Sequence, residues 1–234
     1  MKKIFSHFKE DLLSLFYPNL CCACGDAMQH SIGIICVECQ LHLPQTDFHT
    51  DENNAMIKKF WGRIPVVHAA SYLYFQKDSR VQNLLHELKY KGRTDVGETL
   101  GVFYGSILND SDTVFKKADV ILPVPLHYKK LRKRGYNQSD FFAKGLSKSM
   151  NIAWSDSLLQ RNIFTETQTG KNRIERWENV EDIFELKNKE NFEGKHIILV
   201  DDVVTTGATL EACANALYSK VDCAISILTI ASAV

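Results

Sequence analysis

Two adjacent carboxylates, Asp201 and Asp202, are followed after two residues by a turn of threonine, glycine and alanine. The apolar run at residues 197–200 predicts a parallel strand buried on both faces, and ligands bind at the carboxyl ends of such strands. Apolar spacing after the turn predicts a helix, whose first N–H groups would bind a phosphate, while the carboxylates would bind sugar hydroxyls or Mg²⁺. The pattern predicts a phosphosugar site. The turn consists of Thr205, Thr206, Gly207, Ala208 and Thr209.

The order of acids and turn closely resembles the 5-phosphoribosyl pyrophosphate (PRPP) motif of type I phosphoribosyltransferases. Two alternatives stay open. The acids could form a metal pocket of another doubly wound protein, and Thr-Thr-Gly could be ordinary helix capping. Each part is common alone, but the combined order is much rarer and favours phosphoribosyl binding, provided that strand, loop and helix follow one another.

Seven cysteines occur in a chain that lacks a recognisable secretory signal, which indicates thiols or metal ligands rather than disulfides. Cys21 and Cys24 form one C-x-x-C pair, and Cys36 and Cys39 form a second. Two such pairs predict one tetrahedral structural Zn²⁺ site, with four reduced, metal-free thiols as the alternative. The other cysteines are Cys22, assigned outside the site because its spacing to Cys24 is too tight, and two predicted core residues, Cys213 and Cys223.

Strands and helices alternate through most of the chain, which predicts an α/β fold with a mostly parallel sheet flanked by helices. The length allows one domain plus a small module. We expect residues 1–62 to hold an N-terminal helix, a zinc-ribbon-like module and a linker, and residues 63–234 to form the α/β domain. The region at residues 40–65 looks like connecting chain, and the domain boundary within it is placed near residue 62. Strands are predicted at residues 66–75, 120–124, 197–200 and 223–230, and helices at residues 4–16, 81–88, 96–107, 137–150 and 210–217.

The composition is ordinary for a soluble protein, with 45% hydrophobic and 24% charged residues and a formal net charge of +0. This balance argues against a globally electropositive nucleic-acid binder. The sequence contains no apolar run long enough to cross a membrane. Lys2 and Lys3 are basic, but Glu10 and Asp11 interrupt the apolar stretch that a signal peptide needs, so we expect a cytoplasmic protein.

Three basic segments could accompany the phosphosugar site. Residues 88–93, Leu-Lys-Tyr-Lys-Gly-Arg, close a predicted helix, where cations also complement the helix dipole. Residues 122–138 end a strand and place five cations in a predicted loop, suited to pyrophosphate or simply solvated. Residues 161–184 are polar and aperiodic, as expected of a lid or of a plain surface insertion. The five cations are Lys129, Lys130, Arg132, Lys133 and Arg134.

Together with the cysteine pairs, these segments resemble the ComF family, also called competence protein F or GntX-like phosphoribosyltransferases. The resemblance covers nearly the whole chain, and its anchors are the cysteine module, LKYKGR, PVPLH followed by RGYNQ, and DDVVTTGAT. Departures are small: Tyr128 stands where the family often has proline, Tyr136 stands where phenylalanine is common, and Cys22 adds a thiol beside the predicted zinc ligands. The resemblance implies a type I phosphoribosyltransferase fold and displacement of pyrophosphate from PRPP by a nitrogen nucleophile.

The resemblance also implies roles for individual residues. Asp201 and Asp202 would hold the ribose hydroxyls and the water shell of Mg²⁺, and the Thr205 to Thr209 turn would bind the 5′-phosphate. Lys89 and Arg134 would bind pyrophosphate. The zinc-bearing segment is the candidate for the variable part, called the hood, against which the acceptor rests. The acceptor is an unidentified base or amine, and no residue stands out as a general base. The predicted lid contains Arg161, Thr165, Gln168, Lys171, Arg173 and Arg176.

In a second hypothesis the protein keeps the phosphoribosyltransferase fold but does not catalyse the transfer. In it the chain handles nucleotides or single-stranded DNA during DNA uptake, together with DNA-uptake proteins, as the family's link with natural transformation implies. The basic run would contact phosphates, with Tyr128 and Tyr136 stacking bases. The intact acid pair and turn favour PRPP binding, since backbone contact alone does not need them. A zinc-centred adaptor would explain only the first 40 residues.

Overall fold

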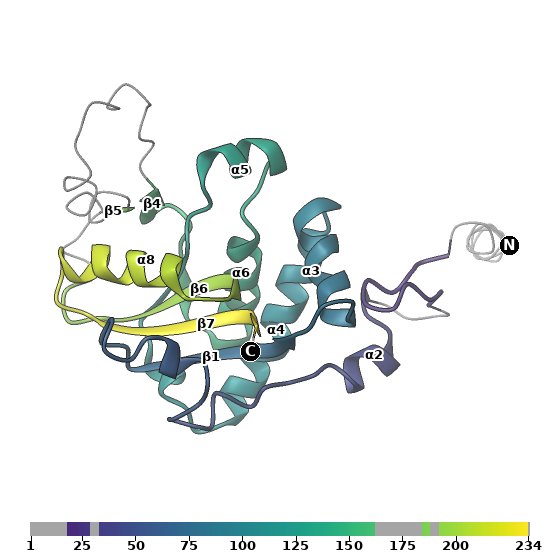
Figure 1. Ribbon diagram of the computed structural model, residues 1–234, viewed down its shortest axis with the longest axis horizontal. Helices are drawn as coiled ribbons and strands as arrows, with labels where there is room; N and C mark the ends of the chain where they lie inside the picture. Colours follow the sequence, from purple (N-terminus) through teal and green to yellow (C-terminus); the bar gives the residue numbers. More distant parts are fainter. Residues whose placement is uncertain (1–17, 29–32, 162–183, 188–191, 234) are drawn as a thin grey trace, which may run out of the picture.

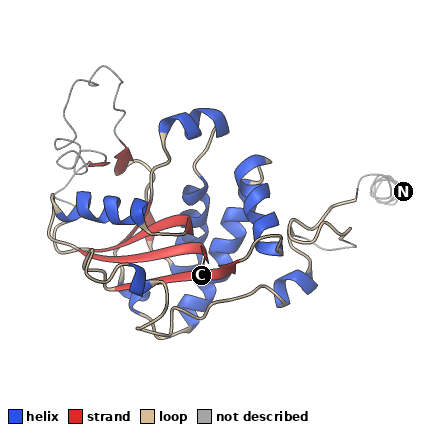
Figure 2. Cartoon of the chain, viewed as in Figure 1, coloured by secondary structure: helices blue, strands red, loops and turns tan. Residues whose placement is uncertain are grey.

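The computed structural model describes residues 18–28, 33–161, 184–187 and 192–233. Its centre is a five-stranded parallel sheet in the order β1-β7-β6-β2-β3, drawn in red in Figure 2. A separate antiparallel pair joins β4 to β5. The strands are β1 His68–Phe75, β2 Val120–Pro123, β3 Ala153–Trp154, β4 Leu159–Arg161, β5 Phe184–Leu186, β6 His196–Val204 and β7 Ala224–Ala233.

Helices cover both faces of the sheet (Figure 1). Parallel strands are joined by right-handed crossovers, so connections that run in opposite directions across a sheet place their helices on opposite faces. The connections from β1 to β2 and from β2 to β3 run one way and carry α3, α4 and α6, whereas that from β6 to β7 runs the other way and carries α8. The helices are α2 Val37–Leu41, α3 Arg80–Tyr90, α4 Thr94–Asp110, α5 Tyr128–Arg134, α6 Gln138–Met150 and α8 Ala208–Tyr218, with short 3₁₀ helices at Ile57–Lys59 and Val114–Lys117.

Glycines bring α4 and α6 into backbone contact. A Cβ atom on Gly101 would lie 2.4 Å from the carbonyl oxygen of Phe142, and one on Gly145 would lie 2.1 Å from that of Glu98. No larger side chain fits at either position without moving a helix. This seam fixes α6, whose first turn reaches the functional site, against α4.

The expected alternation of strands and helices is confirmed, with two corrections. β6 continues through the acid pair to Val204, because it stays paired with β7 up to that residue. The basic segment is not a loop: residues 128–134 form α5, with His127 accepting a hydrogen bond from the backbone N–H of Lys129 and Gly135 ending the helix at φ 85°. The expected N-terminal helix at residues 4–16 lies outside the described residues.

The segment predicted as a linker, residues 40–65, packs against the domain. Met56 and Phe60 are fully buried, and they belong to the same hydrophobic core as the sheet. The side-chain amide of Asn54 donates to the carbonyl oxygens of Phe48 and Ala69, at 2.9 Å and 3.0 Å, and so ties the segment to β1. The boundary near residue 62 stays a prediction. Among the described residues, none of the helices has the length and apolar character needed to span a bilayer.

Candidate active site and cysteine cluster

A cavity of about 630 Å³ opens at the carboxyl ends of β2 and β6, between α3, α5 and α6. Residues from four separate parts of the sequence meet there. The fold therefore brings together the acid pair, part of the turn and cations from three of the basic segments. The predicted site residues that line the cavity are Lys89, Arg134, Arg161, Asp201, Asp202 and Thr209.

The acid pair lies at one wall of this cavity. Asp201 Oδ1 accepts hydrogen bonds from the backbone N–H of Asp202, at 2.8 Å, and from the hydroxyl of Ser139 on α6, at 3.1 Å. Burial, followed by the charge of Asp202, raises the pKa of Asp201 to about 7. The acid pair therefore retains a proton near neutral pH, and a bound cation would favour its release.

Lys89 supplies a cation to the same pair. Its Nζ lies 3.1 Å from Asp202 Oδ2, and both side chains are largely withdrawn from water. The position follows from α3, which is capped by Ser79 and buries Leu84 and Leu88 against the core, leaving Lys89 in the last turn at the cavity. Lys89 is thus the partner of a carboxylate.

The turn after β6 leads directly into α8. Gly207 has φ 80°, a conformation that other residues rarely adopt, and the backbone N–H of Ala208 donates to the hydroxyl oxygen of Thr206 at 3.4 Å. Thr205 and Thr206 are exposed, and Thr209 lines the cavity. The order of strand, turn and helix that phosphate binding requires is present.

α5 gives the cavity a cationic wall. Lys130, Lys133 and Arg134 line it, and the Arg134 guanidinium lies over the ring of Tyr90, 5.5 Å from the centroid. The pKa of His127 is lowered, first by burial and then by the charges of Arg161, Lys129 and Lys130. With Lys130, Lys133 and Arg134 on its lining, the cavity mouth carries positive charge.

Of the residues predicted to form a lid, the structure describes only Arg161. Arg161 ends β4 at the cavity, with its guanidinium 5.3 Å from the centroid of the Phe184 ring on β5. The remaining predicted lid residues, Thr165, Gln168, Lys171, Arg173 and Arg176, lie outside the described residues.

The four predicted metal ligands form one cluster. The sulfur atoms of Cys21, Cys24, Cys36 and Cys39 all lie within 4.8 Å of one another, which is compatible with a tetrahedral thiolate site. Backbone N–H groups of Cys36 and Cys39 donate to cluster sulfurs at 3.3 Å and 3.4 Å and would stabilise thiolates. Cys22 is buried outside the cluster, as expected. The cluster also touches the domain, because Asn83 on α3 donates to the carbonyl oxygen of Ala23 at 2.8 Å.

Sequence reasoning did not identify several residues that contact the site and hold its parts in place. Ser139 binds Asp201 from α6, and Asn137 lies at the cavity, donating to the carbonyl oxygen of Val124 at 3.1 Å. Asn137 belongs to RGYNQ and Ser139 follows it directly, but no local pattern connects Ser139 to an acid 62 positions away. Phe60 and Arg63, from the predicted linker, contact the turn itself.

The parallel sheet, the acid pair and the turn before α8 define a phosphoribosyltransferase-type protein. The family model for the phosphoribosyl transferase domain matches residues 116–234, and the chain belongs to that family. Three relatives have more particular names. The chain is 28% identical to DNA utilization protein YhgH of Escherichia coli, over 92% of this chain and 91% of that protein. It is 27% identical to competence protein ComFC of Bacillus subtilis, over 92% of this chain and 87% of that protein. It is 31% identical to competence protein F of Haemophilus influenzae, over 57% of this chain and 60% of that protein. The resemblance to the ComF family is confirmed.

Proposed function

We propose that this chain binds PRPP with Mg²⁺ and transfers its phosphoribosyl group to a nitrogen acceptor, an unidentified base or amine, in the cytoplasm. One observation carries the proposal: the acid pair, Thr209 of the turn and cations of α3 and α5 line a single cavity. PRPP carries a 5′-phosphate, ribose hydroxyls and a pyrophosphate. Each of these groups has a counterpart of complementary charge or hydrogen-bonding capacity at this site.

In this reaction the bond from C1 to the pyrophosphate oxygen breaks, and a bond from C1 to the acceptor nitrogen forms. The nitrogen loses a proton to solvent, and pyrophosphate leaves. Asp201 and Asp202 would accept hydrogen bonds from the ribose hydroxyls and would help to hold Mg²⁺, while the Thr205 to Thr209 turn would bind the 5′-phosphate. When bound, Mg²⁺ would neutralise charge on the leaving pyrophosphate.

The cations stabilise the leaving group. Lys89 exchanges its contact with Asp202 for the pyrophosphate, and Arg134 binds pyrophosphate from α5. Preorganised cations of this kind act on charge that develops in the transition state. The lid, from Arg161 to Arg176, excludes water that would hydrolyse PRPP. The four-cysteine cluster holds a structural Zn²⁺, in a module of residues 1–62 that precedes the transferase domain of residues 63–234.

The test combines binding and turnover. Mg²⁺-PRPP at a hundredfold excess over Kd should add about 2.7 kcal/mol to the free energy of unfolding, which a thermal shift detects. Asp202→Asn and Thr206→Val should reduce that shift, and Asp222→Asn, an exposed carboxylate just before β7 at the opposite edge of the sheet, should not. Pyrophosphate release in the presence of candidate bases and amines then identifies the acceptor. Failure of saturating Mg²⁺-PRPP to bind by thermal shift and by calorimetry would refute the proposal.

A second function has a specific observation in its favour. All seven residues of α5 are at least partly exposed, and Lys129 and Arg132 do not line the cavity, so they are available to a nucleic-acid backbone. Relatives named for DNA utilization and competence fit single-stranded DNA handling. Fluorescence anisotropy with a labelled oligonucleotide tests this role, and unchanged anisotropy at low salt would exclude it.

A further inference from the structure

The segment 57–65, which the sequence presents as connecting chain, runs along α8 and contacts the turn before it. It touches both ends of the helix: Phe60 and Arg63 contact the first turn, and the carbonyl oxygen of Pro65 accepts a hydrogen bond from the hydroxyl of Tyr218 in the last. Just beyond it, the backbone N–H of Val67 donates to the carbonyl oxygen of Ile225 at 2.8 Å. We call residues 57–65 the α8 strap.

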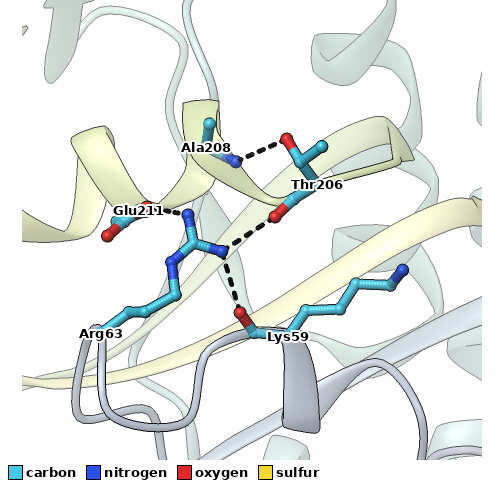
Figure 3. Close-up of polar contacts among 5 residues, drawn as sticks. All are labelled: Lys59, Arg63, Thr206, Ala208 and Glu211. Carbon is cyan, nitrogen blue, oxygen red and sulfur yellow. Dashed lines mark hydrogen bonds and ion pairs between the residues drawn. The ribbon is translucent and has the colours of Figure 1, made fainter.

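Arg63 is the polar centre of the strap (Figure 3). Its guanidinium donates to the carbonyl oxygen of Thr206 at 3.0 Å and to that of Lys59, also at 3.0 Å, and pairs with the carboxylate of Glu211 on α8. Thr206 lies in the turn and Glu211 one helical turn further on. A single planar guanidinium therefore holds the peptide unit after Thr206 against the first turn of α8.

Phe60 provides the apolar half of the same contact. A Cβ atom on Gly207 would lie 2.8 Å from Cε1 and 3.1 Å from Cζ of its ring, so the ring lies directly against the turn backbone. Phe60 is fully buried. With Gly207 held at φ 80°, the ring and the guanidinium leave the turn little freedom to change conformation.

We infer that the α8 strap positions the phosphate turn, with Arg63 as the positioning residue that aims the turn's N–H groups and hydroxyls at the 5′-phosphate; this rests on the proposed function. Arg63 does not line the cavity. It acts through Thr206 and Glu211. Ligands that use the turn should therefore depend on Arg63, and ligands that use only the cationic wall should not.

The experiment compares two probes by calorimetry: ribose 5-phosphate, which needs the turn, and Mg²⁺-pyrophosphate, which lacks the sugar phosphate. Losing the hydrogen bond to the turn should cost Arg63→Ala about three- to tenfold in affinity for ribose 5-phosphate and nothing for Mg²⁺-pyrophosphate. Arg63→Lys should be intermediate, because an ammonium keeps the pairing with Glu211 but not the planar fork. Lys195→Ala is the control, since Lys195 pairs with Asp119 before the amino ends of β6 and β2.

The outcomes separate the inference from the proposal on which it rests. If the wild type binds ribose 5-phosphate and Arg63→Ala binds it equally well, the positioning role is wrong and the proposed function stands. Equal loss of both probes in Arg63→Ala would show a general structural effect and would also overturn the inference. A wild type that binds neither ribose 5-phosphate nor Mg²⁺-PRPP refutes the proposed function itself. Glu211→Gln, which keeps a hydrogen-bonding side chain beside Arg63, repeats the test should Arg63→Ala fail to fold.

Discussion

The raised pKa of Asp201 predicts how the free energy of unfolding depends on pH, and this can be measured without a ligand. Its pKa is raised from an ordinary 3.8 to about 7 in the folded protein, by burial and by Asp202. Between these values the native state holds a proton that the unfolded chain has lost. The free energy of unfolding then falls as pH rises, by about 1.4 kcal/mol per pH unit. Across the whole interval the loss is at most about 4 kcal/mol, and it is complete above pH 7.

Asp201→Asn removes this titration and keeps an oxygen that can accept from Ser139. The variant should therefore be more stable than the wild type at pH 7.5, and its advantage should shrink towards pH 5 and vanish near pH 4. Urea denaturation of both proteins from pH 5 to pH 8, without Mg²⁺, measures this difference and cancels contributions from the histidines. The control Asp119→Asn should act in the opposite direction at neutral pH, because the backbone N–H of His196 and the side chain of Lys195 lower the pKa of Asp119. Parallel stability curves for Asp201→Asn and the wild type, or a less stable variant at pH 7.5, would refute the reasoning.

The remaining predictions concern the metal, the cation of α3, the glycine seam and the basic helix. Purified protein should contain one zinc per chain by metal analysis, and Cys36→Ser should lose it; metal-free wild type prepared without chelator would contradict this. Lys89→Met should weaken Mg²⁺-PRPP binding, measured by calorimetry, by about ten- to a hundredfold, the usual range for a hydrogen bond to a charged group; unchanged affinity would remove Lys89 from the site. Gly145→Ala should cost at least about 1–3 kcal/mol in urea denaturation, because its Cβ would meet backbone at 2.1 Å, and a neutral result would mean that the helices separate easily. If DNA binds, the double variant Lys129→Ala, Arg132→Ala should flatten the salt dependence of anisotropy, by about 0.7 in the log-log slope for each phosphate that is no longer neutralised, and leave PRPP binding intact; impaired PRPP binding would show instead that the outer face of α5 serves the cavity.

Local order in the sequence was sufficient to predict the strand, turn and helix that carry the acid pair, because these elements are consecutive. The cysteine cluster was predictable for a similar reason, since each C-x-x-C pair fixes the relative positions of its two thiols. α5 was missed because it buries none of its residues, and apolar periodicity is the main sign of a helix in a sequence. Two prolines before it also favoured a loop.

Contacts between distant segments could not be predicted in this way. The pairing of Lys89 with Asp202 depends on how α3 packs against the sheet. Four strands of the central sheet lie between Phe60 and Gly207 in the sequence, and an aromatic residue in a polar stretch does not indicate its partner. The sequence indicates that Gly207 precedes a helix, but it does not indicate that the Phe60 ring lies against this glycine.

The strand order has a consequence for the time course of folding. Among the described strands, β1 is flanked in the sheet only by β7. The pairing joins His68 to Ser226 and Phe75 to Ala233, so the partner of each β1 residue is synthesised 158 residues later. During synthesis β1 therefore leaves the ribosome as an apolar strand without its neighbour, while β2 and β3 can already pair. Such a strand exposes unpaired backbone and buried-type side chains until β7 arrives. The nascent chain should be most prone to aggregation, and most dependent on chaperones, in the interval between the appearance of β1 and that of β7.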